Sequence, residues 1–260
     1  MMTSMNPRIR RGIALAAVAL SALSLSACDV EDIDKFLEGL EEPSSSQPAG
    51  EAPEANVAQD DDYFTVTGTA KLEYDAAVGE VDYCPVDELE RPICAYGLLT
   101  YDVRAAAQAR GRQSINVDPV GWPETNPKVK IPALEGVEGS KDYNGYMYNR
   151  SHMLADSLGG SAEADNLVTG TRTQNVGSVK NSGGMAYTEV IARDYLSEKF
   201  ANECPLYYAA TPNYEGDELL PRTVTVDIQS CDNSIDERVV VDNTANGFNV
   251  NYMDGSFTEK

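Results

Sequence analysis

The stretch Tyr148-Asn149-Arg150-Ser151-His152-Met153-Leu154-Ala155-Asp156-Ser157-Leu158-Gly159-Gly160 contains the only histidine of the 260-residue chain. His152 is therefore the only side chain whose unperturbed pKa lies near neutrality, which makes it the first candidate for acid–base chemistry. A lone histidine is more often a structural residue, so its neighbours decide the interpretation. Polar motifs follow at Asp165-Asn166, Thr173-Gln174-Asn175 and Glu189-Val190-Ile191-Ala192-Arg193. These residue types are the ones that a metal ion, a water molecule and a phosphate require.

The segments on either side of His152 predict how it is presented. Residues 143–151 indicate an extended segment that ends at the histidine. Residues 185–201 carry apolar side chains at helical spacing and predict a helix. Glu189 and Arg193 are four residues apart, so they lie on one face of that helix.

The rest of the chain predicts an α+β fold. Residues 63–74 indicate a strand or hairpin, and residues 96–109 are moderately helical. Residues 205–211, 222–228, 237–241 and 248–252 are strand-like. Neighbouring strand-rich segments around a helix favour a mainly antiparallel sheet with flanking helices.

The N-terminus has the features of an export signal. Arg8, Arg10 and Arg11 precede a short apolar run, which is followed by small residues. Leu25-Ser26-Ala27-Cys28 is similar to the bacterial lipobox, in which the cysteine is lipidated and becomes the mature N-terminus. We expect residues 1–27 to be a lipoprotein signal peptide and Cys28 the lipidation site, the alternative being an ordinary signal peptide. The protein would then lie on the extracellular face of the cell membrane, held by its lipid only.

Residues 28–62 predict an acidic, disordered tether. Residues 29–62 carry twelve acidic residues and a single basic one, Lys35. Too little apolar surface is present to offset the entropy of ordering the chain. A short helix over residues 32–40 is the exception we expect. Residues 63–260 then form the folded domain, and we expect a monomer.

Four further cysteines, Cys84, Cys94, Cys204 and Cys231, favour two disulfides in an exported protein. Three pairings are possible, and proximity in the chain favours Cys84–Cys94 and Cys204–Cys231. A zinc site is the weaker interpretation because no CxxC spacing is present.

The net charge of −22 argues against a generic nucleic-acid-binding surface. The distribution of charge weakens that argument, since residues 104–200 carry eleven basic and eleven acidic residues. A local basic cleft could still bind phosphate there.

The residues around His152 meet the needs of phosphodiester hydrolysis. A neutral histidine can deprotonate water, provided that a hydrogen bond holds its second nitrogen. A hard cation such as Mg²⁺ accepts amide oxygens and keeps several waters, one of which can act as the acid. Arginine adds charge and a two-pronged donor geometry suited to phosphate.

The combined motifs resemble the DNA/RNA non-specific endonucleases with a ββα-metal (His-Me finger) core, in particular exported nucleases of Gram-positive bacteria. The resemblance rests on the order and spacing of residues 149–152, 166–175, 184–193, 207–217 and 220–222, and covers roughly residues 83–252. It implies a divalent-metal-dependent endonuclease that hydrolyses DNA, and RNA as well, with little sequence preference. Mg²⁺ or Mn²⁺ would be the cofactor.

The family assigns a role to each matching residue. His152 would be the general base, Asn175 the metal ligand, and Glu189 a ligand of the metal or of its water. Arg150 and Arg193 would stabilise the phosphate, and Asn166 would organise the site. A water on the metal would protonate the leaving group, which gives 5′-phosphate and 3′-hydroxyl ends.

The sequence departs from the family's usual Asp-Arg-Gly-His pattern, with asparagine at 149 and serine at 151. The first change bears on Arg150, because it removes a charge that could orient neighbouring groups. Ser151 is not expected to form a hydrolase dyad with His152, because adjacent residues of an extended chain point to opposite faces.

Structural alternatives exist for several of these residues. Asn166 could simply cap a turn, and Glu189 with Arg193 could be a surface ion pair. The alternative for the whole protein is a non-catalytic surface lipoprotein that binds nucleic acid or another wall polymer.

Overall fold

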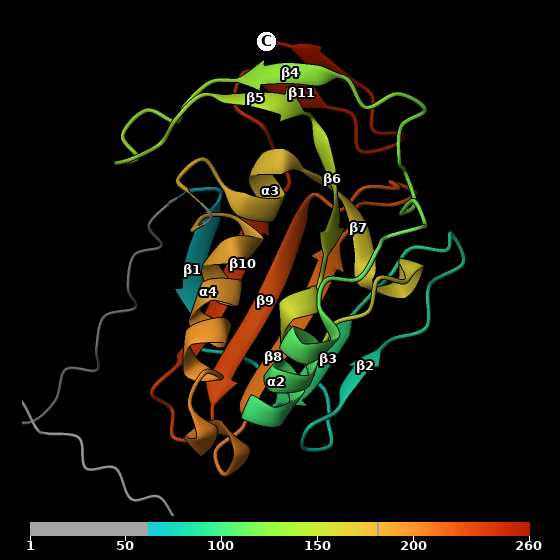
Figure 1. The fold of residues 1–260 in the computed structure, drawn as a ribbon. Helices are drawn as coiled ribbons and strands as arrows, with labels where there is room; N and C mark the ends of the chain where they lie inside the picture. Colours follow the sequence, from blue (N-terminus) through green and yellow to red (C-terminus); the bar gives the residue numbers. More distant parts are fainter. Residues whose placement is uncertain (1–61, 181) are drawn as a thin grey trace, which may run out of the picture. The chain divides into compact units, whose positions relative to one another are not determined.

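The computed structural model describes residues 62–180 and 182–260, in which six antiparallel strands form a central sheet (Figure 1). The strand order is β1-β10-β9-β8-β3-β2. The strands are β1 (Phe64–Gly68), β2 (Val81–Tyr83), β3 (Ala95–Leu99), β8 (Leu206–Asn213), β9 (Thr223–Ser230) and β10 (Asp236–Asp242). The mainly antiparallel sheet expected from the sequence is confirmed.

The central strands β8 and β9 are buried on both faces. Tyr208 points to the helical side, where its hydroxyl is 3.2 Å from the Thr188 hydroxyl. Tyr207, one residue earlier, points to the other side, where its hydroxyl accepts a hydrogen bond from the Tyr74 backbone N–H. The segment that follows β1 therefore covers the face that the helices leave open, where the Lys71 backbone N–H also donates a hydrogen bond to Asp227 of β9.

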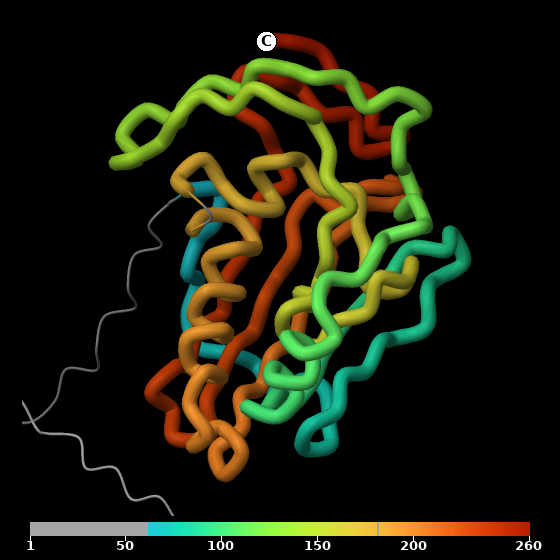
Figure 2. Tube along the Cα trace, viewed as in Figure 1, coloured from blue at the N-terminus to red at the C-terminus, as the bar shows by residue number. Residues whose placement is uncertain are grey.

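Two helices, α2 (Tyr101–Arg110) and α4 (Met185–Tyr195), lie over one face of the sheet (Figures 1 and 2). The Thr100 hydroxyl caps α2 by accepting a hydrogen bond from the Val103 N–H. Helix α4 ends six residues earlier than the sequence predicts, and a 3₁₀ turn, η4 (Lys199–Asn202), follows it. The apolar sides of both helices join the main core cluster between the helices and the sheet.

The helix predicted over residues 96–109 is wrong at its start. Residues 95–99 form β3, a sheet strand whose side chains alternate between buried and half-buried. Pairing with β8 overrides the helical preference of its alanine and leucines. The helix begins only after the Thr100 cap.

Strands β6 (Tyr148–His152) and β7 (Leu167–Thr171) and helix α3 (Arg172–Val176) form a ββα unit. The two strands pair from Tyr148 opposite Thr171 to His152 opposite Leu167. Two 3₁₀ turns, η2 (Asp156–Leu158) and η3 (Ala164–Asn166), lie in the connection between the strands. This is the ββα core that the sequence predicts, with His152 at the end of the first strand and Asn175 in the helix.

Two small hairpins make a second cluster beside the ββα unit. They are β4 (Lys128–Ile131) with β5 (Tyr143–Tyr146), and β11 (Phe248–Val250) with β12 (Phe257–Glu259). Ile131, Tyr148 and Phe248 are buried together in this second core. Tyr148 therefore anchors the first residue of the strand that ends at His152.

Both disulfides favoured by proximity are present, Cys84–Cys94 and Cys204–Cys231. All four sulfurs are thus occupied, and the zinc interpretation of these cysteines is wrong. The first bridge closes a surface loop before β3, and the second joins the segments that flank β8 and β9.

The expectations for residues 1–61, which include the signal peptide, Cys28 and the helix over 32–40, lie outside the described residues. Asp62, expected as the last residue of the tether, is 4% exposed and bonded into the domain. Asp62 is therefore packed within the described domain and is not part of a solvent-exposed tether. Within the part of the chain that the structure describes, no helix has the length and apolar character needed to cross a membrane.

Candidate active site

His152 faces a cavity of about 390 Å³, which we call the His152 cavity. The other polar residues on its wall are Gln108, Arg112, Asp156, Ser157, Asn175 and Glu189. The imidazole Nε2 is buried and has no hydrogen-bond partner among the described residues. Burial lowers the pKa of His152 below its ordinary value, while the nearby Asp156 carboxylate opposes that shift. The lowered pKa favours the neutral imidazole, the form that a general base requires.

Asn175 reaches the same cavity from α3. This short helix begins at Thr171, whose hydroxyl accepts a hydrogen bond from the Gln174 N–H. The Ser151 hydroxyl donates a 3.1 Å hydrogen bond to Oδ1 of Asn175. A carboxamide oxygen has two lone pairs, so one stays available to a ligand.

Ser151 has a structural role that was not predicted from the sequence. It does not form a dyad with His152, as expected, but it is fully buried and orients Asn175. Strand alternation is the cause, because it directs Ser151 toward α3. The pairing of position 151 with position 175 needs the packed ββα unit, and no local sequence pattern reveals it.

Glu189 lies on α4 and faces the cavity, and the Arg193 guanidinium donates a 3.1 Å hydrogen bond to its carboxylate. The Glu189 side chain is 16% exposed, against 30% for that of Arg193. Burial raises the pKa of Glu189, and the charge and hydrogen bond of Arg193 act against that rise. This pair is therefore more than a solvated surface contact, since a largely buried carboxylate at the cavity wall has a hydrogen-bonded guanidinium as its partner. Arg193 itself touches the site through Glu189.

Asn166 is fully buried and holds the loop that follows His152. Its Oδ1 accepts a hydrogen bond from the Leu154 N–H, and its Nδ2 donates to the carbonyls of Leu154 and Ser161. All three distances are 2.8 or 2.9 Å. Asn166 thus supports the site without lining the cavity, because it fixes the backbone at Leu154, two residues beyond the histidine.

Arg150 lies away from the His152 cavity. Its guanidinium lies over the Trp122 ring, 4.6 Å from the ring centroid, and its Nε donates a 2.7 Å hydrogen bond to Asp118. The side chain is exposed. The structure thus gives Arg150 two protein partners outside the cavity wall.

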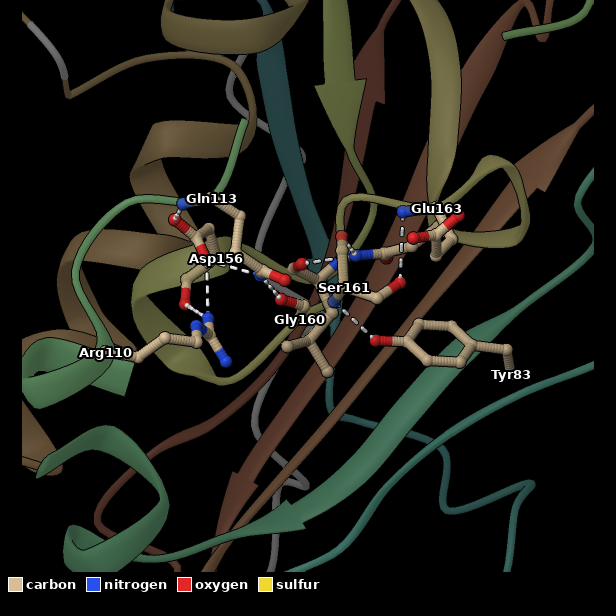
Figure 3. A network of polar contacts seen from close by, with 9 residues as sticks. Tyr83, Arg110, Gln113, Asp156, Gly160, Ser161 and Glu163 are labelled. Carbon is tan, nitrogen blue, oxygen red and sulfur yellow. Dashed lines mark hydrogen bonds and ion pairs between the residues drawn. The ribbon is translucent and has the colours of Figure 1, made fainter. Parts of the chain in front are cut away.

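Arg112 is the arginine that lines the cavity, and it was not predicted from the sequence. Its neighbours are held by Asp156, since Arg110 forms an ion pair with that carboxylate and Gln113 donates to it from both backbone and side chain (Figure 3). Gln113 also donates to the Gly160 carbonyl. Among the described residues Arg112 itself makes no hydrogen bond or ion pair. The network therefore holds residues 110–113 at the cavity and leaves the exposed Arg112 guanidinium without a protein partner among the described residues.

The donors at the cavity fit a hard divalent cation. No group of three or more His, Cys, Asp and Glu side chains among residues 62–180 and 182–260 is arranged to hold a metal. The cavity offers instead the amide oxygen of Asn175 and the carboxylate of Glu189. Magnesium-like ions accept such oxygens and keep several waters, so a small protein donor set suits them.

Comparisons with known proteins identify the family to which the chain belongs. Residues 71–232 match the family model described as DNA/RNA non-specific endonuclease. The chain is 32% identical over 239 residues to a deoxyribonuclease of Streptococcus dysgalactiae subsp. equisimilis, covering 75% of this chain and 72% of that protein. A structure of Sda1 nuclease with a bound zinc ion is also 32% identical, with a TM-score of 0.66 over 76% of this chain and 97% of that one.

A structure of NucA from Streptococcus agalactiae with bound magnesium shares the fold, with a TM-score of 0.59 at 21% identity over 78% of this chain and 90% of that one. The family match spans more than half of the chain, and the ββα unit lies within it. This chain belongs to the DNA/RNA non-specific endonuclease family.

Proposed function

We propose that the His152 cavity is the hydrolytic centre of this endonuclease, with His152 as general base and a divalent cation held by Asn175 and Glu189. The observation that carries the proposal is that these three side chains, from β6, α3 and α4, line one cavity. The chain separates them by 23 and 37 residues, and only the fold brings them together.

Each residue has a defined task in the proposed reaction. Neutral His152 takes a proton from a water molecule, which attacks phosphorus from the histidine side. The bond from phosphorus to the 3′ oxygen breaks on the opposite side, so the phosphate stays on the 5′ carbon and the other product ends in a 3′ hydroxyl. Ser151 orients the Asn175 amide through its hydrogen bond, and Arg193 opposes the effect of burial on the Glu189 carboxylate.

The bound cation would neutralise charge on the phosphoryl oxygens and supply an acidic water to the departing 3′ oxygen. We propose Mg²⁺ or Mn²⁺, because both donors are hard oxygens. Solved structures of Sda1 nuclease with a bound zinc ion and of NucA with bound magnesium support a divalent cation as cofactor.

DNA and RNA are the proposed substrates, cut with little sequence preference. Contacts directed to the phosphate backbone carry no base sequence directly. Arg112 is a cation at the cavity that no acidic partner among the described residues neutralises. The enzyme can therefore bind phosphate locally despite its overall negative charge.

We expect Arg112→Ala to lower kcat/KM on DNA by about 10- to 100-fold, because hydrogen bonds to charged groups contribute about 1.5–3 kcal/mol. Arg150→Ala should change kcat/KM by about threefold or less, since Trp122 and Asp118 already engage its guanidinium. Steady-state cleavage of a fluorescent oligonucleotide measures both. A larger loss of kcat/KM in the Arg150 variant would show that Arg150 binds the phosphate, as the family motif suggests.

The proposed activity is tested by incubating the full chain with closed circular plasmid and with single-stranded RNA, with Mg²⁺ and with EDTA. We expect open circles, then linear and shorter fragments, in Mg²⁺ and no product in EDTA. Ligation of the fragments without prior phosphorylation would support 5′-phosphate ends. Cleavage that continues in EDTA would contradict metal dependence, and binding without product would favour the non-catalytic alternative.

We also propose that the enzyme acts as a monomer on the extracellular face of the cell membrane, anchored by a lipid on Cys28. The basis is the sequence pattern that ends in Leu25-Ser26-Ala27-Cys28. Cys28→Ala is expected to move nuclease activity from the membrane fraction to the culture medium. Unchanged membrane retention in this variant would contradict the anchor.

A further inference from the structure

We propose that Asp62 is a positioning residue that sets the affinity of the site for its cation, by tying together the two helices that carry Asn175 and Glu189. This inference rests on the proposed function. Asp62 contributes no atom to the His152 cavity and would act only through those two residues.

The Asp62 carboxylate binds the chain just after α3. It accepts hydrogen bonds from the backbone N–H groups of Ser178 and Val179 and from the Ser178 hydroxyl. Helix α3 ends at Val176 with Gly177 as its C-cap, so these contacts begin three residues beyond Asn175. A carboxylate that accepts several N–H bonds makes a strong local clamp, because charge-assisted hydrogen bonds are about twice as strong as neutral ones.

The backbone of the same residue binds the start of α4. The Asp62 carbonyl accepts a 2.8 Å hydrogen bond from the N–H of Gly184, the N-cap residue of α4. Glu189 lies five residues further along that helix. One residue therefore fixes the end of the metal-ligand helix α3 and the beginning of helix α4.

Two glycines show how closely Asp62 is enclosed. A Cβ built on Gly177 would lie 2.2 Å from Oδ2 of Asp62, and one built on Gly183 would lie 2.0 Å from it. Gly177 also has a φ of +66°, whereas Gly183 does not have a positive φ. A methyl group at 183 would therefore displace both the Asp62 carboxylate and the Asp62 carbonyl oxygen, which would lie 2.5 Å from that Cβ.

Asp62 is itself anchored to the sheet. The next residue, Tyr63, accepts a hydrogen bond from the Asp242 N–H through its carbonyl and one from the Asn246 N–H through its hydroxyl. Phe64 then begins β1 and stacks on Tyr187 of α4, with ring centroids 4.0 Å apart. The clamp is thus a rigid part of the fold.

A cation held by two side chains from separate helices depends on the spacing of those helices. Residues that orient metal ligands from outside typically change metal affinity by 10- to 100-fold when they are replaced. Loss of the Asp62 clamp should let α3 and α4 move relative to each other. The cost should fall on cation binding and leave DNA binding unaffected.

The test compares Asp62→Asn with a matched control, Asp87→Asn, in the full chain. Asp87 is also a carboxylate that accepts backbone N–H bonds, from Leu89 and Arg91, but it lies in the Cys84–Cys94 loop away from the cavity. Mn²⁺ binding is measured directly by electron paramagnetic resonance on the metal-free proteins, and the Mg²⁺ dependence of cleavage is measured in parallel. Thermal melting reports any loss of stability in each variant.

We expect Asp62→Asn to weaken Mn²⁺ binding about 10-fold or more and to raise the Mg²⁺ concentration for half-maximal cleavage by the same factor, with an unchanged KM for DNA. Asp87→Asn should bind Mn²⁺ as the wild type does. Gly183→Ala carries the same expectation as Asp62→Asn, and it decides the matter if the latter does not fold. The double variant should be no worse than the single ones, because both remove one clamp.

Unchanged Mn²⁺ affinity in a folded Asp62→Asn or Gly183→Ala variant overturns the inference. Equal weakening in Asp87→Asn overturns it too, because the effect would then follow stability alone. A wild-type protein that neither binds Mn²⁺ nor cuts DNA overturns the proposed function and this inference with it. Cleavage by the wild type with unchanged metal binding in the variants overturns this inference alone.

Discussion

Replacing His152 with alanine is expected to lower kcat for plasmid cleavage by about 10²- to 10⁴-fold, the usual contribution of a general base. The fold should persist, because Nε2 has no partner to lose. Thermal melting is therefore expected to match the wild type within a few degrees. The space left by the side chain opens onto the cavity, so added imidazole should restore part of the activity.

The pH profile gives a second readout of the same residue. The base must be neutral, so kcat falls as the pH drops through the pKa of His152. Burial lowers that pKa, so the acid limb should lie below about pH 6.5, the ordinary value for histidine. A variant with wild-type kcat, or an acid limb that survives in His152→Ala, would remove the histidine from the mechanism.

Replacing Asn175 with alanine is expected to have the second-largest effect, loss of measurable Mn²⁺ binding together with cleavage. The change removes an oxygen donor from the cavity and leaves the buried Ser151 hydroxyl without its acceptor. A buried polar group left unpaired costs about 1–3 kcal/mol, so melting should fall by several degrees as well.

Asn213→Ala is the matched control for that experiment. Its amide donates to Thr223 and Thr225 at the end of β8, away from the His152 cavity. It also loses side-chain hydrogen bonds of an asparagine, here at an exposed position, and it should keep its metal affinity. Wild-type Mn²⁺ binding by Asn175→Ala would show that the cation is held elsewhere.

The sequence was sufficient to predict the parts of the site that local patterns encode. The lone histidine at the end of an extended segment, the i,i+4 pair on a helix and the neighbouring cysteines all have local signatures. The ββα core followed from the family resemblance of the motifs around them. Each of these features depends on residues that are close together in the chain.

The features that the sequence did not reveal depend on contacts between distant residues. Arg112 owes its position to Asp156, which holds the residues on either side of it from 44 positions away. Arg150 is two residues from His152, but its guanidinium stacks on Trp122 and donates a hydrogen bond to Asp118, both in an irregular segment. Asp62 looked like the last acid of a tether, and only its enclosure by Gly177 and Gly183 shows its place in the domain.

The strand β3 illustrates the same limit at the level of the fold. Alanine and leucine favour helix locally, yet the pairing of residues 95–99 with β8 decides their conformation. Sheet pairing joins residues that are distant in the chain, so local conformational preference does not predict it.

The central claim is that His152 and the Asn175 cation lie on opposite sides of one scissile phosphate. The most direct measurement is a crystal structure of His152→Ala with Mn²⁺ and an oligonucleotide, in which anomalous scattering locates the metal. We predict one Mn²⁺ between Oδ1 of Asn175, the Glu189 carboxylate and a backbone phosphate, with that phosphate between the metal and the position of the missing imidazole. A metal bound outside this cavity, or a phosphate path that bypasses residue 152, would contradict the account.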